Sequence, residues 1–374
     1  MTASEPLPAR PAEAHAIDVA RSLLAAEDAL AGGLQGSPLG GLRDHSAGGL
    51  RVISTTVGRG QAALAIAAER PDADVTLWCL DLFPMAAAVA SWGVAPAGLR
   101  AVCTPDMPPG PYDLAVVPLS KAGEAELSRD ILQAAIRQLR IGGRLVAAID
   151  NARDNWLREQ LAETGEKVRV RPAPDADTVA YIVEKTREPS RDRDFSCRFV
   201  FRDRERLLTA VTRPGVFAHR RIDPGARHLL NAVDLAPQTR VVDIGCGSGC
   251  VAMGLAARDP SILVHAIDGS ARAVECTRLG AGINGLDNVT VALECEGRVP
   301  EPGSYDLAVA NPPYYSDFRI AELFVEAART ALAPGGTLLI VTKQPTWYLE
   351  HLPSSWQDVA REEVKHYHLI EAVR

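Results

Sequence analysis

Several features of secreted and membrane proteins are missing from this sequence of 374 residues. No run of eighteen apolar residues occurs, so we expect no transmembrane helix. The stretch Met1–Pro6 has neither a cationic start nor an apolar core, which argues against a secretory signal. The seven cysteines are irregularly spaced and do not indicate a disulfide framework in a chain this long. Together these absences predict a reduced, cytoplasmic protein.

An excess of positive charge is also lacking. The 40 Lys and Arg residues are outnumbered by 47 Asp and Glu residues, and the net charge of −7 argues against a general nucleic-acid coat. The composition, 47% hydrophobic and 23% charged, indicates a globular protein, and the length predicts two domains. Residues 185–221 depart from this balance with 11 basic and 5 acidic residues, interleaved with Phe195, Phe199 and Phe201. This segment is either a solvated connector or, as we favour, a contributor to RNA binding.

The chain contains an internal repeat. Tyr112–Val116 recurs as Tyr305–Val309 at an offset of 193, and residues 111–150 match 304–343 at 11 of 40 positions. A weaker match at offset 187 aligns Gly58 with Gly245, Gly60 with Gly247, and Asp81 with Asp268. Such self-similarity is typical of a tandem duplication.

Each repeat alternates strands and helices. In the second copy, an apolar strand at 240–243, a helix at 250–257 and a strand at 262–267 follow one another. This order predicts an α/β fold with a largely parallel sheet and helices on both faces, present twice as two tandem Rossmann-like domains. The boundaries we predict are a disordered amino terminus at 1–16, a first domain at 17–184, a basic linker at 185–212 and a second domain at 213–374.

A glycine-rich loop links the first strand and helix of the second copy. Its sequence is Asp243-Ile244-Gly245-Cys246-Gly247-Ser248-Gly249. Glycines allow a sharp turn and close approach to a ligand, and the helix start supplies amide donors. Asp268, at the end of the next strand, can accept hydrogen bonds from both ribose hydroxyls. Because Cys250 stands where a dinucleotide fingerprint requires Gly or Ala, the spacing favours adenosylmethionine.

A second motif, Asn311-Pro312-Pro313-Tyr314, directly follows the strand at 306–310. Ligands bind beyond the carboxyl ends of such strands. The prolines remove amide donors, which leaves the Asn311 side-chain oxygen and the Pro312 carbonyl to accept both hydrogens of an amino group. Tyr314 can stack on a base. Since a sulfonium methyl is already activated, orientation supplies most of the catalysis and no metal is needed.

These motifs resemble those of class I S-adenosylmethionine-dependent methyltransferases that act on amino groups. Upstream, Arg213–Phe217 and Ile222–Gly225 resemble the lead-in of one subgroup, the tandem-domain ribosomal RNA guanine-N2 methyltransferases with a methyltransferase small domain. The resemblance implies two Rossmann-like methyltransferase domains, of which the first is degenerate and serves RNA binding and support, and the second is catalytic.

The resemblance also implies roles for individual residues. Asn311, Pro312 and Tyr314 hold the target amine and base. The residues implied at the S-adenosylmethionine site are Phe217, Asp223, Gly225, Asp243, Gly245, Gly247, Gly249, Asp268, Glu294 or Glu296, and Asn311. Among them, one of the two glutamates contacts the adenine amino group, and Phe217, Asp223 and Gly225 close over the cofactor. The sequence departs from the subgroup at Tyr314-Tyr315, where Phe-His is usual, and at Val341-Thr342-Lys343, where Val-Ala-Asn is usual.

The first copy lacks several of these residues. Offset 187 places Thr56 at the position of Asp243 and Ala62 at that of Gly249, and offset 193 places Pro118-Leu119-Ser120 at that of Asn311-Pro312-Pro313. We therefore predict that the first copy keeps the fold without the chemistry.

The predicted function is methyl transfer to an exocyclic base amine of RNA, most simply guanine N2 of ribosomal RNA. Adenine N6 in DNA or RNA and a protein glutamine amide are alternatives, although a glutamine-directed enzyme would carry a small helical amino-terminal domain. A non-catalytic RNA-binding or assembly protein is the remaining alternative. Cys246, Cys250 and His265 lack the paired spacing of a metal site, and buried thiols are expected. The oligomeric state is not predicted.

Overall fold

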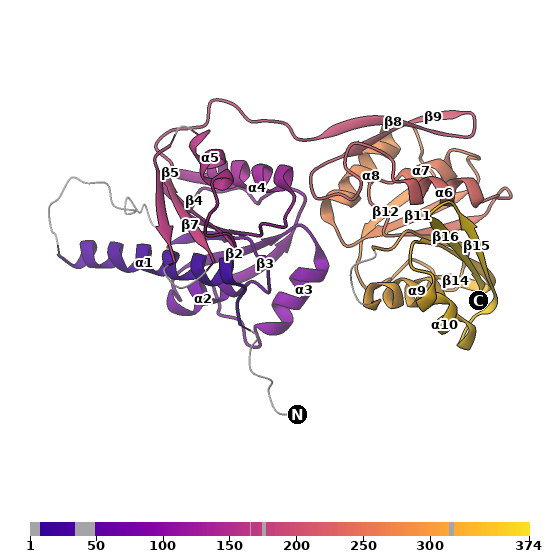
Figure 1. The fold of residues 1–374 in the computed structure, drawn as a ribbon, viewed down its shortest axis with the longest axis horizontal. Helices are drawn as coiled ribbons and strands as arrows, with labels where there is room; N and C mark the ends of the chain where they lie inside the picture. The colour runs from indigo at the N-terminus through magenta and orange to yellow at the C-terminus, as the bar shows by residue number, and fades with distance from the viewer. Residues whose placement is uncertain (1–7, 34–48, 165, 174–176, 314–317) are drawn as a thin grey trace. The chain divides into compact units, whose positions relative to one another are not determined.

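The computed structural model describes residues 8–33, 49–164, 166–173, 177–313 and 318–374 (Figure 1). The chain divides into two compact units, Met1–Phe195 and Ser196–Arg374. The division falls inside the predicted linker at 185–212.

Unit 1 contains a sheet with helices on both faces (Figure 1). Its strands are β1 (Arg51–Ser54), β2 (Asp74–Cys79), β3 (Leu99–Cys103), β4 (Tyr112–Leu119), β5 (Leu139–Ile149), β6 (Val168–Pro172) and β7 (Val179–Glu184). Its helices are α1 (Pro11–Gly33), α2 (Gln61–Glu69), α3 (Leu82–Ser91), α4 (Ala125–Gln138) and α5 (Trp156–Ala162). Among the described residues, the strand order is β3-β2-β1-β4-β5-β7-β6.

Unit 2 repeats this architecture after an added hairpin. The hairpin strands are β8 (Cys197–Asp203) and β9 (Arg206–Thr212). The sheet strands are β10 (Arg240–Ile244), β11 (Leu263–Asp268), β12 (Val289–Leu293), β13 (Tyr305–Ala310), β14 (Leu332–Thr342), β15 (Gln357–Val364) and β16 (Tyr367–Val373). The helices are α6 (Pro224–Ala232), α7 (Cys250–Ala256), α8 (Ala271–Ile283), α9 (Arg319–Ala331) and α10 (Thr346–His351), followed by a 3-10 turn at Leu352–Ser354.

The two sheets have the same strand order, since that of unit 2 is β12-β11-β10-β13-β14-β16-β15 in the described residues. The strands from β10 to β14 are parallel, and β16 is antiparallel to both of its neighbours. The predicted tandem α/β fold is therefore confirmed. The strand order reverses between β10 and β13, since β11 and β12 are added on one side of β10 and β13 and β14 on the other, and open α/β sheets bind ligands in the crevice at this point.

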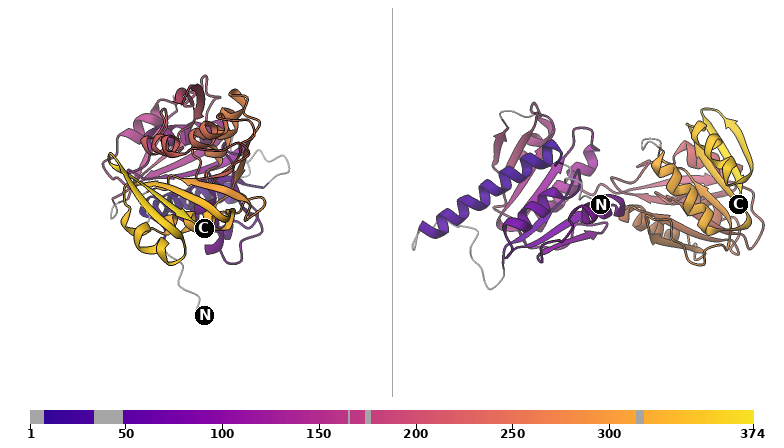
Figure 2. Two further views of the ribbon diagram at one scale, coloured as in Figure 1. Left: turned by 90° about the vertical axis from the view of Figure 1, so that its right-hand side faces the viewer. Right: turned by 90° about the horizontal axis from the view of Figure 1, so that it is seen from below.

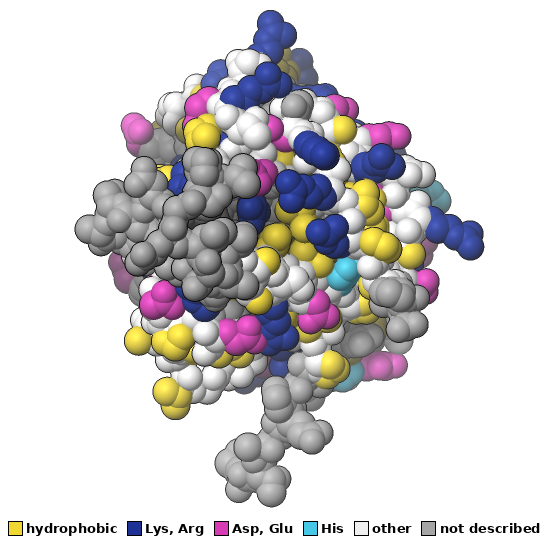
Figure 3. Space-filling view, turned by 90° about the vertical axis from the view of Figure 1, so that its left-hand side faces the viewer, with side chains coloured by type: hydrophobic (Ala, Val, Ile, Leu, Met, Phe, Trp, Pro, Cys, Tyr) yellow, Lys and Arg dark blue, Asp and Glu magenta, His cyan; other side chains and the backbone are white. Residues whose placement is uncertain are grey.

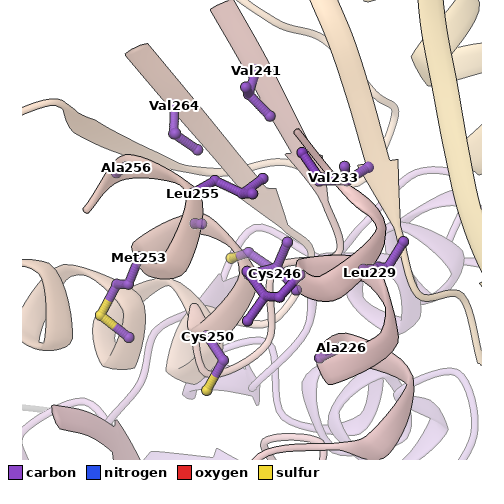
Figure 4. Close-up of a cluster of buried hydrophobic side chains, with 14 of the residues drawn as sticks. Ala226, Leu229, Val233, Val241, Cys246, Cys250, Met253, Leu255, Ala256 and Val264 are labelled. Carbon is purple, nitrogen blue, oxygen red and sulfur yellow. The ribbon is translucent and has the colours of Figure 1, made fainter. Parts of the chain in front are cut away.

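Alternation along the strands divides the core of unit 2 into two layers. Val241 faces helices α6 and α7, whereas its neighbour Val242 faces α9 and α10. Successive strand side chains point to opposite faces, so strands covered on both sides are apolar throughout. Figure 4 shows part of the first layer, where Leu229 of α6 and Leu255 of α7 lie on the same side of the sheet as Val241 of β10 and Val264 of β11.

The strongest part of the sequence repeat has a structural role. Asp113 and Asp306 each accept a hydrogen bond from the first backbone amide of the neighbouring strand, at Arg51 and Arg240 respectively, and both distances are 2.7 Å. The guanidinium groups of these arginines lie 5.1 and 5.3 Å from the ring centroids of the tyrosines that precede the two aspartates. The repeated Tyr-Asp pair thus ties the starts of two central strands together.

The alignment of the two glycine loops at offset 187 is wrong by two residues. The strand pairings, Val52 with Leu114 and Val241 with Leu307, set the loops at offset 189. Gly60 then corresponds to Gly249, and each precedes a helix with φ of 68° and 74°. Because glycine recurs at every second position of the second loop, a two-residue slip still matches glycine to glycine.

The amino-terminal segment is helical earlier than predicted. Helix α1 begins at Pro11, so the prediction of disorder is wrong for residues 11–16, while residues 1–7 lie outside the described residues. Proline is favourable at the first helical position, and Ala and Glu are strong helix formers. Ala12 and Ala16 are buried, and α1 lies along the sheet of unit 1 in contact with β4 and β5 (Figure 2).

The prediction of a linker is wrong for residues 197–212, which form the β8–β9 hairpin of unit 2. Its inner face buries Phe201 and Leu208 in the core that includes α6 and α7. Asp203 and Arg258 form an ion pair of 2.9 Å in which both side chains are buried. Phe199 and Phe201 alternate with exposed residues along β8, and the arginines among those exposed residues give the segment the composition of a charged linker.

The helices of the described residues include none with the length and apolarity to cross a membrane.

Candidate functional site

Three strand ends of unit 2 bring the predicted site residues to one edge of the sheet. The glycine loop follows β10, Asp268 ends β11, and Asn311 follows β13. Both β11 and β13 pair with β10 in parallel, so their carboxyl ends meet at this edge. The backbone amide of Gly247 donates a hydrogen bond of 2.8 Å to Asp268 Oδ2, which joins the loop to the carboxylate directly.

The three loop glycines have different requirements. All have positive φ, of 75°, 55° and 74° at Gly245, Gly247 and Gly249. A Cβ at Gly245 would lie 2.7 Å from the Phe324 ring, and one at Gly249 would lie 2.7 Å from Thr277. A Cβ at Gly247 would have no heavy atom within 4 Å. Packing therefore requires the outer two glycines, whereas the open side at Gly247 leaves its backbone accessible to a ligand.

Asp243 stabilises the helix start that follows the glycine loop. It is 3% exposed, and its Oδ2 accepts a hydrogen bond of 3.0 Å from the amide of Ala252, in the first turn of α7. Burial raises the pKa of Asp243 to about 7; the Ala252 amide opposes this rise and the charge of Asp268 adds to it. The hydrogen bond of Asp243 that the structure describes is thus made to the protein itself, and contact of Asp243 with S-adenosylmethionine stays a prediction.

Asp268 is held by two backbone amides, those of Gly247 and Ser270, both at 2.8 Å. Its own carbonyl oxygen accepts a hydrogen bond of 2.9 Å from the amide of Glu294, which places Glu294 beside it at the end of β12. The Glu294 side chain is 12% exposed and that of Glu296 is 61% exposed. Of the two glutamates, Glu294 is therefore the one set into this edge of the site.

The carboxylate of Glu294 is further oriented by its neighbours. It accepts hydrogen bonds from the Glu296 amide at 2.5 Å and from Arg298 Nε at 3.1 Å. Burial raises the pKa of Glu294, but these hydrogen bonds and the Arg298 charge outweigh burial and lower the pKa below its usual value. Glu294 therefore presents an ionised acceptor.

Asn311 is fixed by a residue 88 positions earlier. Its Nδ2 donates a hydrogen bond of 2.9 Å to Asp223 Oδ2, and Asp223 also caps α6 by accepting from the Ala226 amide at 3.2 Å. A Cβ at Gly225 would lie 2.7 Å from the Asp223 carboxylate and 3.0 Å from Asn311 Oδ1. Because a carboxylate only accepts, the Asn311 amide must turn its NH₂ toward Asp223 and its oxygen away from it. The sequence alone does not indicate this contact.

Pro312, Phe217 and Tyr314 are the other residues that the sequence predicts for the site. Pro312 is buried, whereas Phe217 is 59% exposed in the segment between β9 and α6. That segment is anchored by Arg272, a buried side chain whose Nη1 donates a hydrogen bond of 2.9 Å to the Pro214 carbonyl. Tyr314 lies outside the described residues, so its role stays a prediction.

A cluster that sequence reasoning missed lies at the same edge of the sheet. Lys343, which follows β14, has its Nζ 4.9 Å from the centroid of the Tyr367 ring, and Tyr367 contacts His228 of α6 with centroids 5.3 Å apart. Burial lowers the pKa of His228, as does the charge of Lys365, while Asp223 opposes the shift. The only sequence signal for this cluster is the departure from the subgroup at Lys343.

The cysteines near the loop are buried thiols. Cys250 Sγ lies 3.3 Å from Ser248 Oγ, and burial raises the pKa of Cys250 to about 12. Within the described ranges, no three His, Cys, Asp or Glu side chains are grouped as a metal site would require.

Unit 1 keeps two glycines of the loop but lacks the polar side chains of unit 2 at three corresponding positions. With the corrected offset, Ser54 corresponds to Asp243 and Cys79 to Asp268. Asp81 instead caps α3, accepting from the Phe83 amide at 2.7 Å, as Ser270 caps α8. At offset 193, Pro118 stands in place of Asn311, as predicted.

A side chain from α1 occupies the glycine loop of unit 1. Glu13 is fully buried and accepts hydrogen bonds from Thr56 Oγ1 at 3.0 Å and from the Ala62 amide at 3.2 Å. Thr56 Oγ1 in turn accepts from the amides of Gly58 and Gly60 at 2.8 and 2.9 Å. A Cβ at Gly58, which corresponds to the open Gly247 of unit 2, would lie 2.9 Å from Glu13. Glu13 thus fills the side of the loop in unit 1 that is open at Gly247 in unit 2.

Comparison with known proteins gives a consistent result. Residues 207–371 match the family model described as methyltransferase small domain. Ribosomal RNA small subunit methyltransferase C of Ectopseudomonas mendocina is 31% identical over 257 residues, which cover 66% of this chain and 76% of that protein. The protein of that name in Pseudomonas aeruginosa strain LESB58 is 35% identical over 153 residues, or 39% of this chain. Here the chain spans about half the relative's length, 46%.

A solved structure supports the fold over nearly the whole chain. It is a T. thermophilus 16S rRNA N2 methyltransferase in complex with AdoMet and guanosine, with a TM-score of 0.74 and 23% identity. The match covers 93% of this chain and 91% of that one. At this identity the similarity establishes the tandem fold.

Proposed function

Because the chain belongs to the ribosomal RNA small subunit methyltransferase C family, we propose that it transfers a methyl group from S-adenosylmethionine to an exocyclic base amine of ribosomal RNA, at guanine N2. The observation that carries this proposal is the oriented amide of Asn311. It follows β13 at the same sheet edge as the glycine loop and Asp268.

The residues at this edge fit an adenosine-containing cofactor. The open side of Gly247 admits a ligand to the backbone, Asp268 is placed to accept from ribose hydroxyls, and Glu294 is placed to accept from the adenine amino group. When bound, S-adenosylmethionine supplies an electrophilic methyl group on a sulfonium sulfur. The chain needs only to hold the amine in line with that methyl, since proximity and orientation supply most of the rate enhancement.

Asn311 and Pro312 orient the amine. Asn311 Oδ1 and the Pro312 carbonyl accept its two hydrogens, which directs the nitrogen lone pair toward the methyl group. Positive charge develops on the nitrogen during transfer, and the same two oxygens stabilise it until a proton is lost to water. Asp223 acts on this step indirectly, because its carboxylate sets the orientation of the Asn311 amide.

We further propose that unit 1 serves RNA binding and support and has no cofactor of its own. Glu13 and Thr56 satisfy the loop donors, and Cys79 and Pro118 replace the two functional side chains. The face drawn in Figure 3 carries basic side chains beside hydrophobic ones, a surface suited to phosphates and bases.

The test is transfer of labelled methyl from S-adenosylmethionine to RNA, DNA and protein fractions from cells that lack this protein. Wild type is expected to label ribosomal RNA and to yield N2-methylguanine on digestion. Asn311→Ala is expected to lower transfer by at least 100-fold, since it removes an acceptor used in the transition state. The matched control is Asn231→Ala, which removes an exposed amide on α6.

The other outcomes are distinct. Label recovered as N6-methyladenine or in protein would replace the substrate and leave the roles of Asn311 and Pro312 standing. No label in any fraction, together with no binding of S-adenosylmethionine by calorimetry, would favour a non-catalytic RNA-binding or assembly protein and overturn the proposal.

A further inference from the structure

Three aromatic rings with nearly parallel planes follow the reaction motif. Phe318 and Trp347 lie with ring centroids 5.9 Å apart and an interplanar angle of 4°. Trp347 and His351 lie with centroids 4.6 Å apart and an angle of 15°. None of these three residues is used in the cofactor site or in the orientation of the amine.

Strand topology places these rings near the reaction motif. Phe318 immediately precedes α9 and ends the segment that Asn311 begins, while Trp347 and His351 belong to α10, which follows β14. Strands β13 and β14 are paired and parallel, so the segments after them start at the same edge of the sheet. The rings therefore belong to the edge where the target base must bind.

The ring cluster is anchored but not buried. Trp347 packs against the core layer of α9 and α10, and the adjacent Tyr348, which meets it edge-on, is 3% exposed. Phe318 is 36% exposed and His351 is exposed. A core-filling role would have buried Phe318, as it has buried Tyr348.

The backbone conformation of Phe318 also points to a functional role. Its φ of 61° is in the left-handed region, which bulky residues rarely adopt. Strained backbone of this kind persists where the surroundings impose it, and it is concentrated at functional sites. The strained turn keeps the Phe318 ring on Trp347 at the protein surface.

Positive charge adjoins the rings. Arg319, next to Phe318, is exposed and forms no ion pair with another described residue. Flat aromatic surface beside a basic side chain is the combination that holds single-stranded nucleic acid, with a base on the rings and a phosphate near the charge.

We propose that Phe318, supported by Trp347, is a stacking site for an unpaired RNA base adjoining the target nucleotide. This inference rests on the proposed function. The target base itself must reach Asn311, so a base on Phe318, at the far end of the same segment, belongs to a neighbouring nucleotide. Stacking on a π face is sequence-tolerant, and the site therefore contributes affinity for the RNA rather than choice of the target base.

The test compares Phe318→Ala, Phe318→Tyr and wild type in methyl transfer to ribosomal RNA from cells that lack this protein. Phe318→Ala is expected to raise KM for RNA about tenfold, the loss typical of one stacked base. The affinity for S-adenosylmethionine and the rate of transfer to free guanosine, which has no neighbouring base, are expected to stay unchanged. Phe318→Tyr keeps the ring and should behave as wild type.

Leu263→Ala is the control, because Leu263 is a 52% exposed apolar residue at the amino end of β11, away from the edge of the sheet that holds Asn311. A KM for RNA within twofold of wild type in Phe318→Ala would overturn the stacking site while the proposed function stands. A parallel loss of S-adenosylmethionine affinity would assign Phe318 a structural role and also overturn it. Wild type without any methyl transfer would defeat the function and the stacking site together.

Discussion

At the scale of single residues, one carboxylate decides which way the amide of Asn311 points. Asp223 can only accept hydrogen bonds, so the contact of 2.9 Å admits the NH₂ group and rejects the oxygen. Gly225 is part of the same arrangement, because a side chain there would collide with the Asp223 carboxylate at 2.7 Å. The motif of four residues after β13 therefore depends on a cap and a glycine at the start of α6.

Asp223→Asn is expected to lower kcat about 10- to 100-fold, because an amide at this position accepts either orientation of Asn311. The size corresponds to loss of about 1.5–3 kcal/mol, the value of a hydrogen bond to a charged group. The affinity for S-adenosylmethionine, measured by calorimetry, should change less than threefold.

Asp81→Asn is the control for this variant, since Asp81 caps α3 of unit 1 in the same manner. If Asp223→Asn weakened cofactor binding and left kcat unchanged, Asp223 would act on the cofactor and the positioning role would be wrong.

At the scale of elements, α1 completes unit 1 by inserting Glu13 into the glycine loop. Burial raises the pKa of Glu13, against hydrogen bonds from the Ala62 amide and Thr56 that lower it. The folded form therefore binds a proton more readily than the unfolded chain, and the contribution of this group to stability falls as pH rises through the raised value. A protonated carboxyl group still has an oxygen that accepts hydrogen bonds, so Glu13 remains an acceptor for Thr56 and the Ala62 amide below the raised pKa.

Glu13→Ala is expected to lower the free energy of unfolding of unit 1 by about 2–3 kcal/mol, since it leaves buried donors without their acceptor. For a unit of this size the midpoint of thermal unfolding should fall by about 4–10 °C. Calorimetric scans of the full chain measure this change. Asp18→Ala removes an exposed carboxylate from the same helix, 74% exposed, and should shift the midpoint by less than 2 °C. Equal midpoints for the two variants would refute the role of Glu13.

At the scale of the whole molecule, the protein is a duplicated fold with one candidate site. The two sheets share their strand order and the Tyr-Asp tie between central strands. In unit 2 the loop has an open side at Gly247 and a carboxylate at Asp268, whereas unit 1 has Glu13 against Gly58 and a thiol at Cys79. Duplication has preserved what the fold needs in both units and the chemistry in one.

Titration of the full chain with S-adenosylmethionine is accordingly expected to give one binding site per chain. Asp268→Asn should weaken it at least tenfold, because the ribose would lose a charged acceptor. Cys79→Asp should not create a second site, since Glu13 and Thr56 still satisfy the loop amides of unit 1. A stoichiometry of two would contradict this account. So would residual binding of S-adenosylmethionine by Asp268→Asn that becomes tighter when Glu13→Ala is added to the same chain.

The sequence by itself determined the duplication, the tandem α/β fold and the position of both motifs of unit 2. These properties follow from local patterns, because continuous apolar runs, glycines with positive φ and prolines after a strand act through neighbouring residues. Local patterns also misled at the amino terminus, where an Ala-rich and Glu-rich segment reads as disorder until α1 is seen packed on β4 and β5.

Tertiary structure alone decided which residues complete the two loops. Glu13 meets Thr56 across 43 positions, and Asp223 meets Asn311 across 88. The offset of 189 between the first loops likewise came from strand pairing, because alternating glycines fit equally well two residues apart. Such contacts depend on how the elements pack, and no periodicity along the chain records which distant side chain will satisfy a given amide.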